Sequence, residues 1–151
     1  MAYTTINKST DYFNTKLYTG NGTDNHAITG VGFQPDFVWF KDRDAANDHS
    51  LYDAIRGATK RLKSDQNTAE STQSDGLKSF NSDGFTLGTH GGSNGNNNDY
   101  ASWNWLGANG TASNTDGSIT STVSANTTAG FSIVSYTGTG ANATVGHGLG
   151  A

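Results

Sequence analysis

Hydrophobic and polar residues alternate along several short segments of the chain, and a period of two residues predicts β-strands rather than helices. Residues 12–18 alternate in this way, with Phe13 and Leu17 on the same face. Residues 37–40 are apolar at every position, which is typical of a central strand with both faces covered. We expect further strands at residues 50–55, 77–80, 84–88, 118–123 and 131–136.

The segment 100–106 also alternates, and it places Trp103 and Trp105 on one face of a strand. Helical periodicity is nearly absent. The best candidate, residues 57–70, lacks a continuous apolar stripe and is expected to form a loop or one helical turn. Because short strands separated by turn residues are typical of two-layer β folds, the pattern predicts an all-β protein, a jelly-roll-like antiparallel β-sandwich of two sheets.

The core of this sandwich is expected to contain large apolar side chains from the alternating segments. These are Phe13, Leu17, Phe40, Leu51, Phe80, Phe85 and Leu87. Trp103 and Trp105 are expected to fill the same core, because large aromatic side chains are mostly buried. Residues 91–98 (GGSNGNNN) contain only Gly, Ser and Asn, carry no apolar side chain, and are expected to form an exposed loop.

The composition agrees with a turn-rich β protein. Only 32% of the 151 residues are hydrophobic and 15% are charged, and Asp outnumbers Glu twelve to one. Asp favours turns whereas Glu favours helices, so this ratio indicates strands and turns. The absence of Cys excludes disulfides, thiolate metal sites and cysteine nucleophiles. The net charge of −4 argues against a nucleic-acid partner, and no apolar stretch is long enough for membrane insertion.

Two sequence strings near the start of the chain recur near its end. Residues 18–22 (YTGNG) recur 118 positions later at 136–140 (YTGTG). Residues 28–33 (ITGVGF) are echoed 116 positions later at 144–149 (TVGHGL). A period of this length is that of a domain rather than of a solenoid repeat.

The repeat predicts a division of the chain. We expect a β-sandwich module at residues 1–107, a linker at 108–117, and the first hairpin of a second, truncated repeat at 118–151. Alternatively, residues 118–151 supply strands that complete the sandwich of this chain or of a neighbouring one.

Several longer motifs resemble a single protein family. They are residues 18–22, 28–41 (ITGVGFQPDFVWFK), 51–53, 56–60, 64–65, 82–85 and 101–105 (ASWNW). Over residues 12–150 the chain resembles the repeated module of structural proteins from marine bacteriophages, notably cyanophages and their relatives. The resemblance implies a concanavalin A-like or laminin-G-like fold and a place in a tail fibre, spike or other appendage, and it assigns no site residue.

On this resemblance we expect a non-enzymatic virion structural protein that mediates assembly and host-surface attachment. The alternative is a stand-alone, lectin-like receptor module that binds carbohydrate. The expected partners are other virion proteins, further copies of the chain with a trimer favoured, and a host-surface glycan. Because the first twelve residues are polar and lack the apolar core of a signal peptide, we expect synthesis in the host cytoplasm and incorporation into the virion.

Candidate catalytic groups are scarce. A glycosidase needs two carboxyl groups flanking the scissile bond, but Glu70 is the only Glu and lies in an expected loop. Asp83 and Asp99 are better explained as turn residues, so no catalytic residue is assigned. No cofactor is expected. Structural calcium stays open, because residues 42–48 and 96–99 are rich in the Asp and Asn oxygens that calcium prefers.

Five neighbouring residues are the candidates for a carbohydrate site. Trp103, Trp105 and Tyr100 offer aromatic faces for a sugar ring, and Asp99 and Asn104 offer hydrogen-bonding groups. The adjacent Asn-rich loop would form the rim of such a site.

Overall fold

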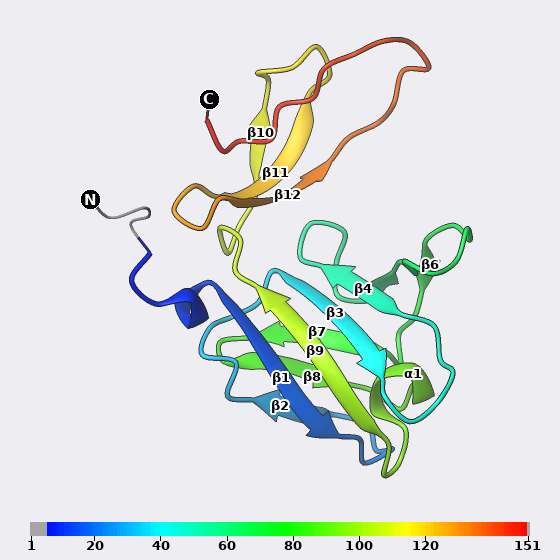
Figure 1. Ribbon diagram of the computed structural model, residues 1–151. Helices are drawn as coiled ribbons and strands as arrows, with labels where there is room; N and C mark the ends of the chain where they lie inside the picture. Colours follow the sequence, from blue (N-terminus) through cyan, green and yellow to red (C-terminus); the bar gives the residue numbers. More distant parts are fainter. Residues whose placement is uncertain (1–5, 151) are drawn as a thin grey trace.

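The structure is a computed structural model that describes residues 6–150, so the first five residues of the expected module, and Ala151, lie outside it. Two sheets face each other, and a third sheet lies beyond one end of them (Figure 1). The helical segments are the single-turn η1 (Ser9–Asp11) and α1 (Gly91–Asn94). Within the described residues, no helix is long and apolar enough to cross a membrane.

The first sheet has four antiparallel strands. Their order is β1 (Phe13–Thr19), β9 (Asp99–Trp105), β3 (Phe37–Asp42) and β4 (Ser50–Asp53). Strand β9 pairs with β1 on one side and with β3 on the other, so Trp103 lies opposite both Thr15 and Trp39.

The second sheet packs face to face against the first. Its order is β2 (His26–Thr29), β8 (Gly84–Leu87) and β7 (Leu77–Asn81). The rings of Phe40 from β3 and Phe85 from β8 meet between the sheets, with their centroids 5.0 Å apart. This arrangement confirms the predicted all-β sandwich of two antiparallel sheets.

The segment 57–70 forms a loop that contains the two-residue strand β5 (Lys60–Arg61). Strand β5 pairs with β6 (Ser71–Thr72) in a separate two-stranded antiparallel ribbon. A bridge between Leu51 and Leu62 joins this ribbon to the edge of the first sheet.

The sandwich core differs from the predicted one at strands β1 and β4. Its buried members are Ile28, Val31, Phe33, Val38, Phe40, Tyr52, Leu77, Phe85 and Leu87. Phe40, Phe85 and Leu87 were predicted correctly, and Phe80 packs against this core while partly buried.

Three other core predictions are wrong, because the register turns their side chains away from the second sheet. Leu17 is 60% exposed and Phe13 is 36% exposed on the outer face of the first sheet. Leu51 pairs with Trp39 on that outer face, whereas the neighbouring pair of Val38 and Tyr52 is buried. Since side chains alternate along a strand, the burial of Val38 excludes Trp39 and Leu51 from the core.

The third sheet consists of β10 (Ala112–Asn114), β11 (Ser121–Asn126) and β12 (Phe131–Ser135), in that order. The expected linker at 108–117 therefore contains a strand, because residues 112–114 pair with 121–123 of β11. The chain then returns along this sheet, where Val145 forms a parallel bridge to Ile119.

A buried carboxylate joins the sandwich to the third sheet. Asp36, which is 1% exposed, accepts hydrogen bonds through Oδ2 from the backbone N–H groups of Gly107 (2.8 Å) and Asn109 (2.9 Å). Burial raises the pKa of Asp36, although these two hydrogen bonds favour its charged form. The N–H of Ala108 donates to Ser124 Oγ of β11 at 2.9 Å, so both layers hold the connecting segment.

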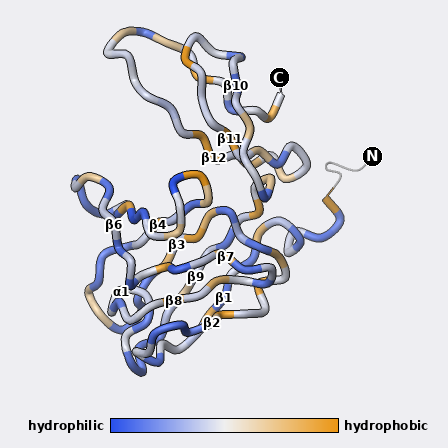
Figure 2. Tube along the Cα trace, turned by 180° about the vertical axis from the view of Figure 1, so that it is seen from behind, coloured by the Kyte–Doolittle hydropathy of each residue, from blue (hydrophilic) through white to orange (hydrophobic). Residues whose placement is uncertain are grey.

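The scarcity of apolar residues is visible along the whole trace. Figure 2 shows hydrophobic positions in short stretches separated by long neutral or hydrophilic segments. The sandwich therefore depends on polar contacts between its loops as well as on its apolar core.

Candidate binding surface

The outer face of the first sheet carries a group of large apolar side chains outside the sandwich core. We call it the outer aromatic face; its residues are Phe13, Leu17, Phe37, Trp39, Leu51, Trp103 and Trp105. Cross-strand pairing aligns these residues in rows, because directly opposed residues of neighbouring strands lie on the same face of a sheet. One row contains Thr15, Trp103, Trp39 and Leu51.

Trp39 and Trp103 form the centre of the outer aromatic face. Their rings meet edge to face, with ring centroids 5.8 Å apart and an angle of 61° between the ring planes. The indole Nε1–H of Trp39 donates a hydrogen bond to His49 Nδ1 at 2.7 Å, which fixes the orientation of the Trp39 ring. Both indoles are only half-buried, so part of each ring is accessible to a ligand or to another protein.

Trp105 is covered at one end of the outer aromatic face. The ring centroids of Phe13 and Phe37 lie 4.8 Å and 5.3 Å from that of Trp105. The ring of Phe131, from β12, stacks on Trp105 with a centroid distance of 6.0 Å and an angle of 20° between the ring planes. Phe131 thereby docks the third sheet onto the sandwich. The open part of the face is the part that holds Leu17, Trp39 and Trp103.

The structure separates the five predicted carbohydrate-site residues onto two sides of the sheet. Asp99, Trp103 and Trp105 face outward, whereas Tyr100 and Asn104 face inward and are buried. The expectation that Trp103 and Trp105 fill the sandwich core is therefore wrong. Strand alternation explains both results, since five consecutive or near-consecutive residues of a strand cannot share one face.

The outward-facing Asp99 lies at the far end of the sheet from Trp105. It accepts a hydrogen bond from Thr19 Oγ1 at 2.8 Å, and Arg43 Nη1 lies 3.9 Å from its carboxylate. The inward-facing Asn104 donates through Nδ2 to the carbonyl oxygen of Asn14 at 3.0 Å. The latter contact is structural, because it lies inside the sandwich.

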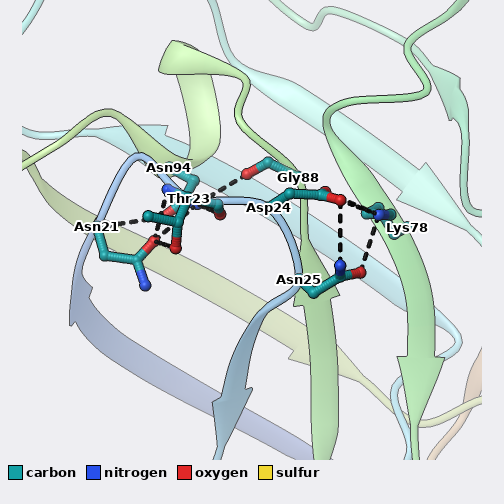
Figure 3. A network of polar contacts seen from close by, with 7 residues as sticks. All are labelled: Asn21, Thr23, Asp24, Asn25, Lys78, Gly88 and Asn94. Atoms are coloured by element: carbon teal, nitrogen blue, oxygen red, sulfur yellow. Dashed lines mark hydrogen bonds and ion pairs between the residues drawn. The ribbon is translucent and has the colours of Figure 1, made fainter.

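The predicted loop at 91–98 is partly buried, contrary to the expectation of an exposed loop. Residues 91–94 form α1, in which Gly92, Ser93 and Asn94 are buried. Asn94 Nδ2 donates to the carbonyl oxygens of Gly88 (2.7 Å) and Thr23 (2.9 Å), and Asn94 Oδ1 accepts from the N–H of Asn21 (3.0 Å) (Figure 3). Asn94 thus binds the turn after β1 to the segment before β9.

Polar residues near Asn94 extend the same network. His26 Nδ1 contacts Asn94 Oδ1 at 2.7 Å. Beyond the turn, Lys78 Nζ lies 2.7 Å from Asp24 and donates to Asn25 Oδ1 at 2.9 Å (Figure 3). The sequence signal for this network was weak, because a run of Gly and Asn predicts solvent exposure unless a distant partner buries it.

The Asp-rich segment after β3 uses its carboxylate oxygens within the protein. Asp42 accepts hydrogen bonds from the N–H groups of Asp44 and Ala45 and from the side-chain amides of Asn47 and Asn98. Burial alone would raise the pKa of Asp42, but these four donors together lower it. Within residues 6–150, no group of three or more His, Asp or Glu side chains is placed to hold a metal ion.

The carboxylates considered for catalysis also have structural contacts. Asp83 accepts from the N–H of Gly32 (2.6 Å) and of Gly30 (3.0 Å), which lowers its pKa. Glu70 pairs with Arg56 at 2.9 Å, in the ribbon region. A carboxyl group with a lowered pKa is a poor general acid at neutral pH, so Asp83 does not match the general-acid role in glycoside hydrolysis.

A cavity of about 460 Å³ lies between the 108–114 segment and β11. Its lining consists of small and aliphatic residues with Thr111, Ser113 and Asn114, and it contains no aromatic or charged side chain. Ligand sites normally combine apolar walls with placed polar or charged groups, so the outer aromatic face is the better candidate.

The fold and this face define an all-β, two-layer sandwich with an aromatic sheet surface. Over residues 8–151 the chain matches a family described as "Domain of unknown function (DUF7483)", and it belongs to that family. Comparison with curated proteins gives no match. Comparison with solved structures gives none either.

Replacing Asn94 with Ala should lower the free energy of unfolding by about 2–4 kcal/mol, because buried carbonyl groups lose their donor. Asn96→Ala is the matched control on the exposed part of the same segment, and it should change stability by less than about 0.5 kcal/mol. Urea denaturation of both variants measures the difference. Equal stability of the two variants would show that the Asn94 network contributes little.

Stability should also fall as the pH drops below about 6.5, the ordinary pKa of His. Burial, aided by the charge of Arg61, lowers the pKa of His90, and His90 Nδ1 accepts a hydrogen bond from the N–H of Gly92 at 3.2 Å. With a lower pKa in the folded state than in the unfolded state, His90 stabilises the fold above pH 6.5. That contribution is lost as the pH falls towards the folded-state pKa.

The variant His90→Asn keeps an acceptor at the start of α1 but cannot titrate. Unfolding free energies of the wild-type chain and of His90→Asn, measured by urea between pH 5 and pH 8, should therefore diverge in their slopes. Parallel curves would show that His90 does not contribute to the pH dependence.

Proposed function

We propose that this chain is a non-enzymatic structural protein of a bacteriophage virion, part of a tail fibre, spike or other appendage. We further propose that its outer aromatic face contacts neighbouring virion proteins or further copies of the chain. The resemblance of residues 12–150 to phage appendage modules supports the virion assignment. The single observation that carries the assembly role is the half-open sheet face around Trp39 and Trp103.

This face has the composition of a protein-protein contact. Aromatic residues are enriched in the cores of interfaces, where truncation of a few of them removes most of the binding energy. Leu17 is 60% exposed, in the row next to the paired indoles, and lies opposite the buried Ala101. The third sheet covers only the Trp105 end of the face through Phe131.

The charge pattern also favours such a contact. The open part of the outer aromatic face contains Lys41 but no acidic side chain, and the Asp residues of β9 and β4 lie at its ends. Desolvating this central region on binding would therefore bury few charges.

The assembly role predicts self-association that depends on the outer aromatic face. Leu17→Asp should weaken association at least about tenfold, because it places a carboxylate in the contact. Ala27→Asp is the matched control, since Ala27 is exposed on β2 of the other sheet. Sedimentation velocity over a concentration series, with circular dichroism to check the fold, measures both.

A trimer or another oligomer that Leu17→Asp dissociates and Ala27→Asp does not would support the proposal. A wild-type chain that is monomeric at all concentrations, and that also fails to bind the neighbouring appendage proteins, would contradict it.

A second candidate function is carbohydrate binding, favoured by the geometry of Trp39 and Trp103. Two half-exposed indoles on the outer face of the sheet, with Thr15 and Lys41 beside them, offer both aromatic surface and hydrogen-bonding groups for a sugar. This site differs from the predicted one, because Trp39 replaces Tyr100 and Asn104 as the neighbour of Trp103.

Carbohydrate binding predicts reproducible signals on a glycan array that Trp103→Ala reduces at least about tenfold. Trp103→Phe is the conservative control, and it should retain part of the binding because a ring remains at that position. Absence of any bound glycan, or binding that Trp103→Ala leaves unchanged, would exclude this site.

A further inference from the structure

Strand β12 is a second copy of β1 in sequence and in its following turn. The recurrence at 18–22 extends backwards along both strands. The shared residues are Phe13, Tyr18, Thr19, Gly20 and Gly22, which recur as Phe131, Tyr136, Thr137, Gly138 and Gly140. Gly22 and Gly140 also share a left-handed backbone, with φ of 65° and 74°.

In the sandwich, the tyrosine of β1 and the glycines of the turn after it have packing roles. Tyr18 stacks on Tyr100 of β9 at 5.2 Å, and its hydroxyl donates to the carbonyl oxygen of Ser93 at 2.7 Å. The N–H of Gly20 donates to the carbonyl oxygen of Asn98 (2.8 Å).

The two glycines of that turn lie against the segment before β9. The N–H of Gly22 donates to the carbonyl oxygen of Asn94 at 2.9 Å. A Cβ on Gly20 would overlap the carbonyl oxygen of Gly95, so only glycine fits there. The pattern therefore serves to dock a turn onto the segment that precedes β9.

In the copy, the tyrosine and the two glycines have no such neighbours. Tyr136 is 57% exposed, and no atom lies within 4 Å of a Cβ built on Gly138 or on Gly140. Strand β12 is also an edge strand, because it pairs only with β11 among the strands of its sheet. After β1, neighbouring atoms leave little or no room for a side chain at the two glycines. After β12 the corresponding glycines are present although no neighbouring atom restricts them.

We propose that the free edge of β12, together with the turn 137–140, is a docking site for a strand of the β9 type and the Asn-rich segment before it. The partner would be a further module of the same kind that lacks its own first strand. By analogy with the register of β1 and β9, the partner's equivalents of Tyr100 and Trp105 would lie opposite Tyr136 and Phe131.

A second complete copy of this chain is a poorer partner. Its β9 is already paired on both edges, with β1 and with β3, so docking would first have to displace β1. A module without a first strand has the corresponding edge free. This docking site is a strand edge, whereas the outer aromatic face is a sheet surface. Phe131 is the residue that connects the two, because its ring stacks on Trp105.

The test adds a synthetic peptide of residues 91–106 to the full chain and measures hydrogen exchange at residues 131–138. We expect slower exchange at β12 and reduced solvent accessibility of Tyr136. Gly138→Ala should abolish the effect, because the equivalent position after β1 admits no Cβ. The same substitution should leave the stability of the chain without peptide unchanged, since nothing lies within 4 Å of that Cβ.

Gly20→Ala serves as the matched comparison, because the same change in the docked turn should destabilise the sandwich. The isolated peptide could fail to bind for reasons of its own, so a second measurement uses a fusion in which residues 36–107 follow Ala151. Hydrogen exchange at β12 is then compared in this fusion with and without Gly138→Ala. Slower exchange at β12 that Gly138→Ala reverses, in either format, supports the proposal. No slowing in both formats, slowing that is indifferent to Gly138→Ala, or faster exchange at β1 through strand displacement would overturn it.

Discussion

The pairing of β9 with β1 on one edge and β3 on the other is the constraint on which the rest of the structure depends. Once Val38 and Phe40 of β3 face the second sheet, the register of β9 sends Ser102 and Asn104 inward and Trp103 and Trp105 outward. The side-chain amide nitrogen of Asn104 and the hydroxyl of Ser102 donate to the backbone of the adjacent β1. Ser102 Oγ donates to the carbonyl oxygen of Lys16 at 3.3 Å. The indoles are thereby available to the outer face and to Phe131 of the third sheet.

A protein with so few aliphatic residues relies on buried polar groups to hold its loops. Asn94, Asp42 and Asp36 are each about 1% exposed or less, and each binds backbone groups of segments distant or adjacent in sequence. A buried hydrogen bond contributes only about 1 kcal/mol on average, but a buried group left without its partner costs more. These three side chains therefore determine where the loops lie, while Phe40 and Phe85 provide the apolar contact between the sheets.

The two proposed contacts use different parts of the molecule. The outer aromatic face would bind through side chains on a sheet surface, whereas the edge of β12 would bind through backbone hydrogen bonds and a glycine turn. The two sites meet at Phe131, whose ring contacts Trp105 and Phe37 of the outer aromatic face while its backbone belongs to β12. Such a module would join neighbours both along a chain of modules and sideways.

The amino-acid sequence by itself determined the secondary structure class, the sandwich architecture and the recurrence at residues 18–22 and 136–140, because alternation, turn residues and repeats are local signals. It did not determine which face of each strand is buried. Leu17 and Trp103 are as hydrophobic as core residues, and only pairing with Ala101 and Trp39 on the outer face shows that they lie outside the core. Nor did it reveal Asn94 as a buried centre of hydrogen bonds, since its partners Asn21 and Thr23 lie about seventy residues away. Those outcomes belong to the tertiary structure, because burial depends on which distant segment covers a residue, and a single sequence does not record that choice.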